Sequence, residues 1–214
     1  MTLIAEDLLI LLLDDVKGTV SPWGTTDTAL GGAVLAELAL MGLATIDEKK
    51  SIWRAQKVHA TGAAPADLHP VLADGLAIVA EKDRWPSTLV SKLGKGLHDR
   101  LAAGLAERRI LERREGKRLG LLPRTTWPAA DTSRDHQMRR AITVCLVDGG
   151  RPDDRNAALI ALLAAIDEAH KAVATNHALT TRQLKKRAKE IAEGQWPAHA
   201  VKDALAAAAS ASGA

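Results

Sequence analysis

The chain has 214 residues and a formal net charge of +3, a length that holds one large domain or two small ones. Its aromatic residues are five tryptophans, with no phenylalanine or tyrosine, so the core must be aliphatic, which favours helices over strands. A single cysteine, Cys145, excludes an internal disulfide, and its apolar surroundings predict a buried thiol.

The N-terminus lacks the basic region of a secretory signal, and Glu6 and Asp7 interrupt its apolar run. We interpret these two acids as partners of the positive end of a helix dipole. The uninterrupted apolar run at 8–13 is far shorter than the roughly 20 residues that cross a bilayer. We therefore expect a cytoplasmic protein, peripheral at the inner face of a membrane.

The spacing of apolar residues predicts a succession of helices with two short hairpins and no internal repeat. The predicted helices cover 2–13, 29–41, 70–81, 85–93, 94–109, 132–147, 153–173, 180–194 and a last segment from 196. The predicted hairpins cover 43–60, with arms at 44–46 and 52–54, and 110–122, with its turn at 115–117; a short strand is expected within 17–23.

These elements predict a mainly α, single-domain helical bundle with small β-hairpins. The helices at 3–13, 29–41, 132–147 and 153–173 are expected at its centre. The predicted domain covers 1–205, and the Ala, Ser and Gly residues of 206–214 are expected to form a frayed tail.

The helix predicted at 29–41 carries Gly31 and Gly32 in its first turns, where each costs roughly 1 kcal/mol against alanine. Such glycines indicate that something approaches the backbone closely. One interpretation is the packing of another helix. The other is an anion held at the N–H groups of this helix start, beside Trp23.

No pattern of catalytic or metal-binding residues is present. Residues 167–170 spell the letters of a helicase box, but no GxxxxGK[ST] phosphate loop accompanies them, and they are expected inside a long helix. The seven histidines lack ligand spacing, and no GxSxG elbow occurs. We therefore predict a non-enzymatic protein without metal or cofactor.

Positive charge is concentrated between residues 95 and 124, which contain nine Lys and Arg and four acids. Such a segment favours phosphate-bearing partners, either lipid headgroups or nucleic acid. On one helix Lys95 and His98 would be i, i+3 neighbours able to share a compact anion, unless they are ordinary solvated charges. A predicted hairpin beside them carries leucines ringed by cations, which suits a membrane interface unless the leucines pack inward. These leucines are Leu119, Leu121 and Leu122.

At this point the chain resembles the Golgi phosphoprotein 3 family, peripheral membrane proteins that bind phosphatidylinositol 4-phosphate, and in particular its bacterial members. The resemblance extends over about 210 residues and rests on three ordered stretches. They are 3–14 with Gly18 and Trp23, then 30–42, then 100–111 running into 125–128.

The resemblance implies which residues hold a lipid headgroup. The family's Trp falls on Trp23, its first Arg on Gly31, and its later Arg pair on Lys95 and His98, with Arg100 as a further basic position. It also implies that Leu119, Leu121 and Leu122 form a membrane-inserting hairpin. Because Gly31 and His98 replace arginines, the resemblance implies weaker binding of this lipid or another acidic lipid.

We therefore expect a non-enzymatic protein that docks on acidic phospholipid or phosphoinositide membranes, with no nucleic-acid partner. The alternative is a nucleic-acid-binding protein that uses residues 95–124 as recognition helix and wing.

Overall fold

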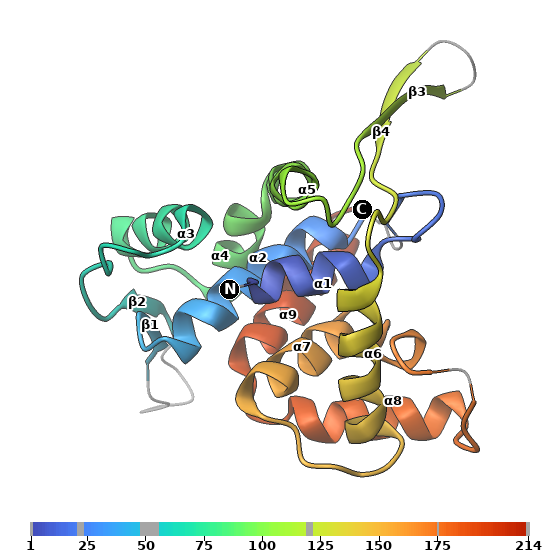
Figure 1. Ribbon diagram of the computed structural model, residues 1–214. Coiled ribbons are helices and arrows are strands. Elements are labelled where there is room, and N and C mark those ends of the chain that lie inside the picture. Colours follow the sequence, from blue (N-terminus) through green and yellow to red (C-terminus); the bar gives the residue numbers. More distant parts are fainter. Residues whose placement is uncertain (1, 21–23, 48–55, 119–121, 175, 213–214) are drawn as a thin grey trace.

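The computed structural model describes residues 2–20, 24–47, 56–118, 122–174 and 176–212 (Figure 1). The chain forms one mainly helical domain with two separate antiparallel hairpins, which confirms the predicted fold class. The helices are α1 (Ile4–Leu12), α2 (Thr26–Leu40), α3 (Pro70–Glu81), α4 (Pro86–Gly94), α5 (Leu97–Glu107), α6 (Ser133–Leu146), α7 (Asp154–Ala165), the short 3-10 helix η1 (Ala169–Lys171), α8 (Thr181–Ala192) and α9 (Trp196–Ser212). The strands are β1 (Ala44–Ile46), β2 (Val58–Ala60), β3 (Arg114–Arg118) and β4 (Leu122–Thr126).

Helix α2 forms the centre of the bundle and contacts α1, α3, α4, α5, α7 and α9. Every residue from Ala29 to Leu38 is buried, and α1 is buried along its whole length. A helix that is covered on all sides must be apolar all round. This requirement explains the near-continuous aliphatic sequence of α1, to which Glu6 and Asp7 are the exceptions. Gly42 ends α2 with a φ of +70°, as its position predicts.

The long helix predicted at 153–173 is wrong in its second half. Helix α7 ends at Ala165, because Asp167 adopts a left-handed φ of +63° and stops the helix. The chain then forms η1 before it turns toward α8. The helicase-like letters at 167–170 therefore lie in a turn and η1, and not within a long helix.

Both hairpins form, but their strands differ from the predicted ones. Strand β1 is at the predicted place, while its partner is β2, where Ile46 lies opposite Val58. The arm predicted at 52–54 lies outside the described residues. Of the strand predicted within 17–23, the described part contains a single bridge between Leu13 and Val20.

In the second hairpin the predicted turn is wrong. Gly116 lies within β3 opposite Arg124, and Arg118 pairs with Leu122. The strands are therefore connected by residues 119–121, which lie outside the described residues. The described part of the return arm therefore begins at Leu122. Leu119 and Leu121 belong to the connection, and Leu122 is the first residue of β4.

Hairpin β3–β4 projects away from the helices (Figure 1). Its base is fixed by the loop after α1, where the N–H of Trp127 donates to the carbonyl of Gly18 at 2.8 Å. Gly18 has a φ of +60°, and a Cβ there would lie 2.3 Å from the Trp127 nitrogen. Only glycine fits this contact without strain, so the base of the hairpin depends on Gly18. Trp127 itself is buried.

The C-terminal helix α9 packs on α2, α4 and α7 and continues to Ser212. The end predicted as a tail is therefore helical as far as the structure describes it. The boundary at 205 and the fraying of 206–214 stay predictions. None of the helices in the described segments is long and apolar enough to cross a membrane.

Candidate functional site

The junction between α4 and α5 separates the lysine and histidine positions that the sequence placed together. Gly96 adopts a left-handed φ of +69° at the N-cap, so α5 begins only at Leu97. Lys95 is therefore outside the helix. The prediction that Lys95 and His98 share one helical face is wrong, because the i, i+3 relation requires a continuous helix.

On one side of Gly96 lies a hollow of about 300 Å³ between the first turns of α2 and α5, which we call the His98 hollow. Its walls include Gly24, Asp27, His98 and Asp99. Two helix N-termini favour an anion in such a place. However, Asp27 and Asp99 already supply carboxylates there, and His98 Nδ1 lies 2.8 Å from an oxygen of Asp99. The field of the hollow is thus mixed in sign.

Trp23 directly precedes Gly24 in the chain and lies outside the described residues. Both Val20 and Gly24 line the His98 hollow. The chain around Trp23 thus begins and ends at this hollow, while the position of the Trp23 ring stays a prediction.

On the other side of Gly96 lies a smaller hollow of about 110 Å³, which we call the Lys95 hollow. Its floor is apolar and comes from α2, α3, α4 and the start of α5, and its rim carries three cations and one acid. Arg100 pairs with Asp74 at 2.7 Å. The cations are Lys92, Lys95 and Arg100.

Of these cations, Lys92 was missed in the prediction from sequence. Its side chain comes from α4 and pairs with Glu81 of α3. A signal was present in the sequence, because Lys92 precedes Lys95 by three residues. The Lys95 hollow is the more positive of the two, so an anionic group is favoured here over the His98 hollow.

Gly31 lines neither hollow, because α4 covers it. A Cβ at Gly31 would lie 2.0 Å from the carbonyl oxygen of Val90, and one at Gly94 would lie 1.8 Å from the carbonyl oxygen of Asp27. The two helices thus cross with their backbones in contact. Gly32 faces α9, where a Cβ would lie 2.2 Å from a methyl group of Val201. Close helix packing explains both glycines, which corrects the expectation that Gly31 forms a wall of the headgroup site.

Three arginines at and near the described strands of the hairpin are exposed to solvent. Arg113, Arg114 and Arg124 are exposed, and Arg113 lies over the ring of Trp127 at 6.0 Å from its centroid. In the sequence, Lys117 and Arg118 add two further cations before the connection at 119–121. Residues 112–126 thus contain five cations and two acids. In the sequence, these cations flank the segment that carries the leucines.

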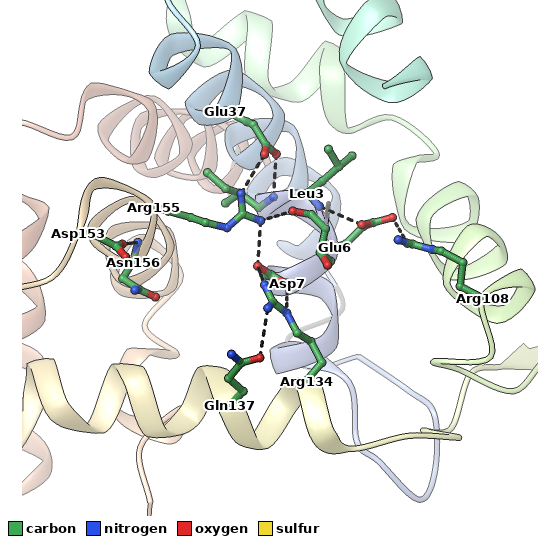
Figure 2. A network of polar contacts seen from close by, with 12 residues as sticks. Leu3, Glu6, Asp7, Glu37, Arg108, Arg134, Gln137, Asp153, Arg155 and Asn156 are labelled. Carbon is green, nitrogen blue, oxygen red and sulfur yellow. Dashed lines mark hydrogen bonds and ion pairs between the residues drawn. The ribbon is translucent and has the colours of Figure 1, made fainter. Parts of the chain in front are cut away.

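A buried ionic network holds these elements around α1 (Figure 2). Asp7 accepts two hydrogen bonds from Arg134, at 2.9 and 2.6 Å, and one from Arg155 at 2.9 Å. Arg155 also reaches Glu37 of α2 at 3.0 Å. Burial raises the pKa of Glu37, and the N–H of Ile4 and the Arg155 guanidinium oppose this shift.

The network also reaches the end of α5. Arg108, which follows α5, pairs with Glu6, and the second oxygen of Glu6 accepts from the N–H of Leu3 at 2.9 Å. This pair fixes the chain where it leaves α5 toward the hairpin. From the sequence, Glu6 and Asp7 were interpreted only as dipole partners. Two acids inside an aliphatic helix were the missed signal, since buried carboxylates need cationic partners.

The described residues contain no group of three His, Cys, Asp or Glu side chains that could hold a metal ion. The absence of a metal or cofactor stays a prediction.

A comparison with models of protein families matches residues 4–208 to the family described as Golgi phosphoprotein 3. The chain belongs to the Golgi phosphoprotein 3 family. The match spans nearly the whole described fold, from α1 into α9. At the level of the Golgi phosphoprotein 3 family, membership supports a lipid-associated role with binding of phosphoinositide. A comparison with curated proteins gave no match.

Proposed function

We propose that the protein is a non-enzymatic peripheral membrane protein of the cytoplasm. It binds bilayers that contain acidic phospholipid, with hairpin β3–β4 as the segment that meets the membrane. The observation that carries the proposal is the hairpin itself. It projects from the bundle (Figure 1). In the sequence, its cations flank a connection that contains Leu119 and Leu121.

The energetics of this contact come from two sources. Leucines at the end of the hairpin enter the acyl boundary, where full burial of each side chain contributes about 1.5–3 kcal/mol. The cations meet acidic headgroups, at about 1 kcal/mol for each near an anionic surface. Five cations against two acids therefore favour an anionic bilayer over a neutral one.

The headgroup is proposed to bind at the α4–α5 junction. Lys95 and Arg100 supply fixed positive charge from the Lys95 hollow. On the other side of Gly96, the imidazole of His98 and the ring of Trp23 are proposed as further contacts to the headgroup. Gly31 is left out of this set because α4 covers it. Because Lys95 offers a point charge and Arg100 already pairs with Asp74, a phosphoinositide such as phosphatidylinositol 4-phosphate loses bidentate arginine contacts.

The hairpin is tested by liposome flotation with neutral phosphatidylcholine, with added phosphatidylserine, and with added phosphatidylinositol 4-phosphate. We expect Leu121→Asp to weaken binding to anionic vesicles about tenfold, since it removes one inserted apolar side chain and adds repulsion. Leu40→Asp is the matched control, because Leu40 is an exposed leucine at the far end of α2.

Two results would contradict the membrane function. One is wild-type binding that is no stronger to anionic or phosphoinositide vesicles than to neutral ones. The other is an equal effect of Leu121→Asp and Leu40→Asp. Strong, salt-sensitive binding to random duplex DNA without vesicle binding would support the alternative of a recognition helix and wing.

The headgroup assignment is tested separately with the hairpin intact. Lys95→Ala with Arg100→Ala should lower the preference for phosphatidylinositol 4-phosphate over phosphatidylserine more than His98→Ala does, because the Lys95 hollow holds the fixed charge. Trp23→Ala tests the predicted role of that ring. If His98→Ala has the larger effect at neutral pH, the headgroup binds in the His98 hollow.

A further inference from the structure

Helix α8 carries a cationic face that the membrane function does not use. The face consists of Arg182, Lys185, Lys186 and Lys189, which line one open hollow of about 780 Å³. Their i, i+3, i+4 and i+7 spacing places them on a single stripe about 10 Å long.

The packing of α8 does not require these four cations. Leu184 and Ala188 form the buried side of the helix, which lies against α7. A fifth cation, Arg187, has a structural role, because it donates to the carbonyls of Leu146 and Val147 at the end of α6, at 2.8 and 2.7 Å. The other four do not cap the end of a neighbouring helix in this way, and of these Lys185 and Lys186 have acidic neighbours.

The arrangement is also unfavourable for the helix itself. Like charges at i, i+4 destabilise a helix, and the stripe contains two such pairs. Arg182 lies two residues after the N-cap Thr180, at the end of the helix where the dipole disfavours a cation. A sequence selected for helix stability alone would place acids at this end.

Acidic side chains of the protein neutralise only part of the positive charge on the cationic face of α8. Lys185 pairs with Asp167 at 2.6 Å, and Lys186 lies 3.7 Å from Glu190. Arg182 and Lys189 form no ion pair with the residues that the structure describes. The cationic face of α8 therefore keeps a net positive charge.

The position of the face indicates the kind of partner. Helix α8 lies at the end of the molecule opposite to hairpin β3–β4 (Figure 1). When the hairpin meets a bilayer, as proposed above, α8 faces the aqueous phase. A protein that makes about 6–10 phosphate contacts to DNA neutralises more charge than a stripe of four cations, with Asp167 and Glu190 beside it, can supply. A short acidic peptide segment matches both the length and the charge.

We propose that the cationic face of α8 docks an acidic segment of a soluble partner protein, with carboxylates spaced along about 10 Å. The choice of a soluble partner over a bilayer rests on the proposed orientation of the hairpin. The charge complementarity itself is independent of that orientation.

The test uses the full chain and a fluorescein-labelled octaglutamate peptide in an anisotropy titration, at low ionic strength and at about 0.15 M salt. We expect the wild type to bind the peptide, and Arg182→Glu with Lys189→Glu to weaken binding about tenfold. The matched control is Lys82→Glu with Arg151→Glu, which makes the same change in net charge at exposed cations elsewhere and should leave binding nearly unchanged. Circular dichroism verifies the fold, and Arg182→Gln with Lys189→Gln replaces the reversal if that variant fails to fold.

Equal weakening in the α8 variant and the control would overturn the proposal, because net charge alone would then explain binding. Absence of wild-type binding to the peptide at low salt would also overturn it. A short DNA duplex and phosphatidylserine vesicles are titrated in parallel, and tighter binding of either through the α8 cations would reassign the face. Flotation separates the two functions, since the α8 variant should still float and Leu121→Asp should still bind the peptide.

Discussion

The substitution Gly31→Ala tests whether close helix packing explains the glycine at the start of α2. The added methyl group would lie 2.0 Å from the carbonyl oxygen of Val90 and 2.6 Å from the amide nitrogen of Gly94. Both atoms belong to the backbone of α4, so neither can rotate away. The whole of α4 must therefore move outward, or α2 must bend.

The expected magnitude combines two opposing effects. Overpacking costs about 1–3 kcal/mol, and contact with backbone on a packed helix favours the upper end. Replacement of glycine by alanine inside a helix returns about 1 kcal/mol. We therefore expect Gly31→Ala to lower the free energy of unfolding by about 2 kcal/mol, out of a total of about 5–15 kcal/mol for a domain.

The assay is urea denaturation followed by circular dichroism, with Gly104→Ala as the control. Gly104 lies within α5, and a Cβ added there would have no heavy atom within 4 Å, so alanine should raise the free energy of unfolding. The two substitutions should shift the urea midpoint in opposite directions. A midpoint for Gly31→Ala at or above the wild-type value would refute the packing explanation, as would a folded Gly31→Arg variant with stronger phosphoinositide binding.

Two further predictions concern the charged groups of the bundle. Arg155→Ala should lower the free energy of unfolding by about 3 kcal/mol, because it leaves buried carboxylates of α1 and α2 short of a partner. Lys185→Ala removes an exposed ion pair and should lower this free energy by less than about 1 kcal/mol. Both values are measured by the same denaturation assay. If the two variants lost equal free energy of unfolding, the stabilising role of the buried ionic network would be contradicted. Hydrogen bonds to Asp83 and Asp47 raise the pKa of His59 above its ordinary value of 6.5. The stabilisation that these contacts give is therefore fully present below pH 6.5. It is lost as the pH rises through the raised pKa of the folded state. An NMR titration of the His59 ring should show this raised pKa and a downward shift in Asp83→Asn, and an unchanged midpoint in that variant would contradict the assignment.

The sequence predicted helices well where the apolar period is long and the ends carry clear signals. Residues 70–81 are α3 with the predicted bounds, and the helix predicted at 132–147 is α6. The second hairpin shows the limit of local patterns. Gly116 lies in the predicted turn at 115–117, and only the pairing of Arg118 with Leu122 shows that the connection comes later. Strand register depends on the partner strand, which a local pattern does not contain.

The candidate site was predicted less well, because its geometry depends on contacts between distant segments. A glycine in a helix indicates a close approach, but the sequence does not distinguish a helix from a ligand as the approaching group. The left-handed Gly96 separates Lys95 from His98, although their spacing alone suggested one face. The pairing of Asp7 with Arg155 joins residues 148 positions apart, beyond the reach of any local pattern.

The distribution of charge explains how one small protein can present two different surfaces. Four buried acids, Glu6, Asp7, Glu37 and Asp135, are neutralised by arginines within the bundle, so they contribute little to the outer field. Hairpin residues 112–126 hold five cations and two acids, and α8 holds five cations and one acid. These two segments together exceed the net charge of +3, so the rest of the chain is net acidic.

Charge alone therefore cannot decide which end meets a membrane, since both ends attract anions. Apolar side chains make the distinction. In the sequence, Leu119 and Leu121 lie between the two strands of the hairpin and Leu122 begins β4, whereas α8 buries Leu184 and Ala188 against the bundle. Insertion of even one leucine outweighs the difference of a single surface cation. We thus expect the bilayer at the hairpin. We expect α8 to bind a partner that offers negative charge but no apolar phase.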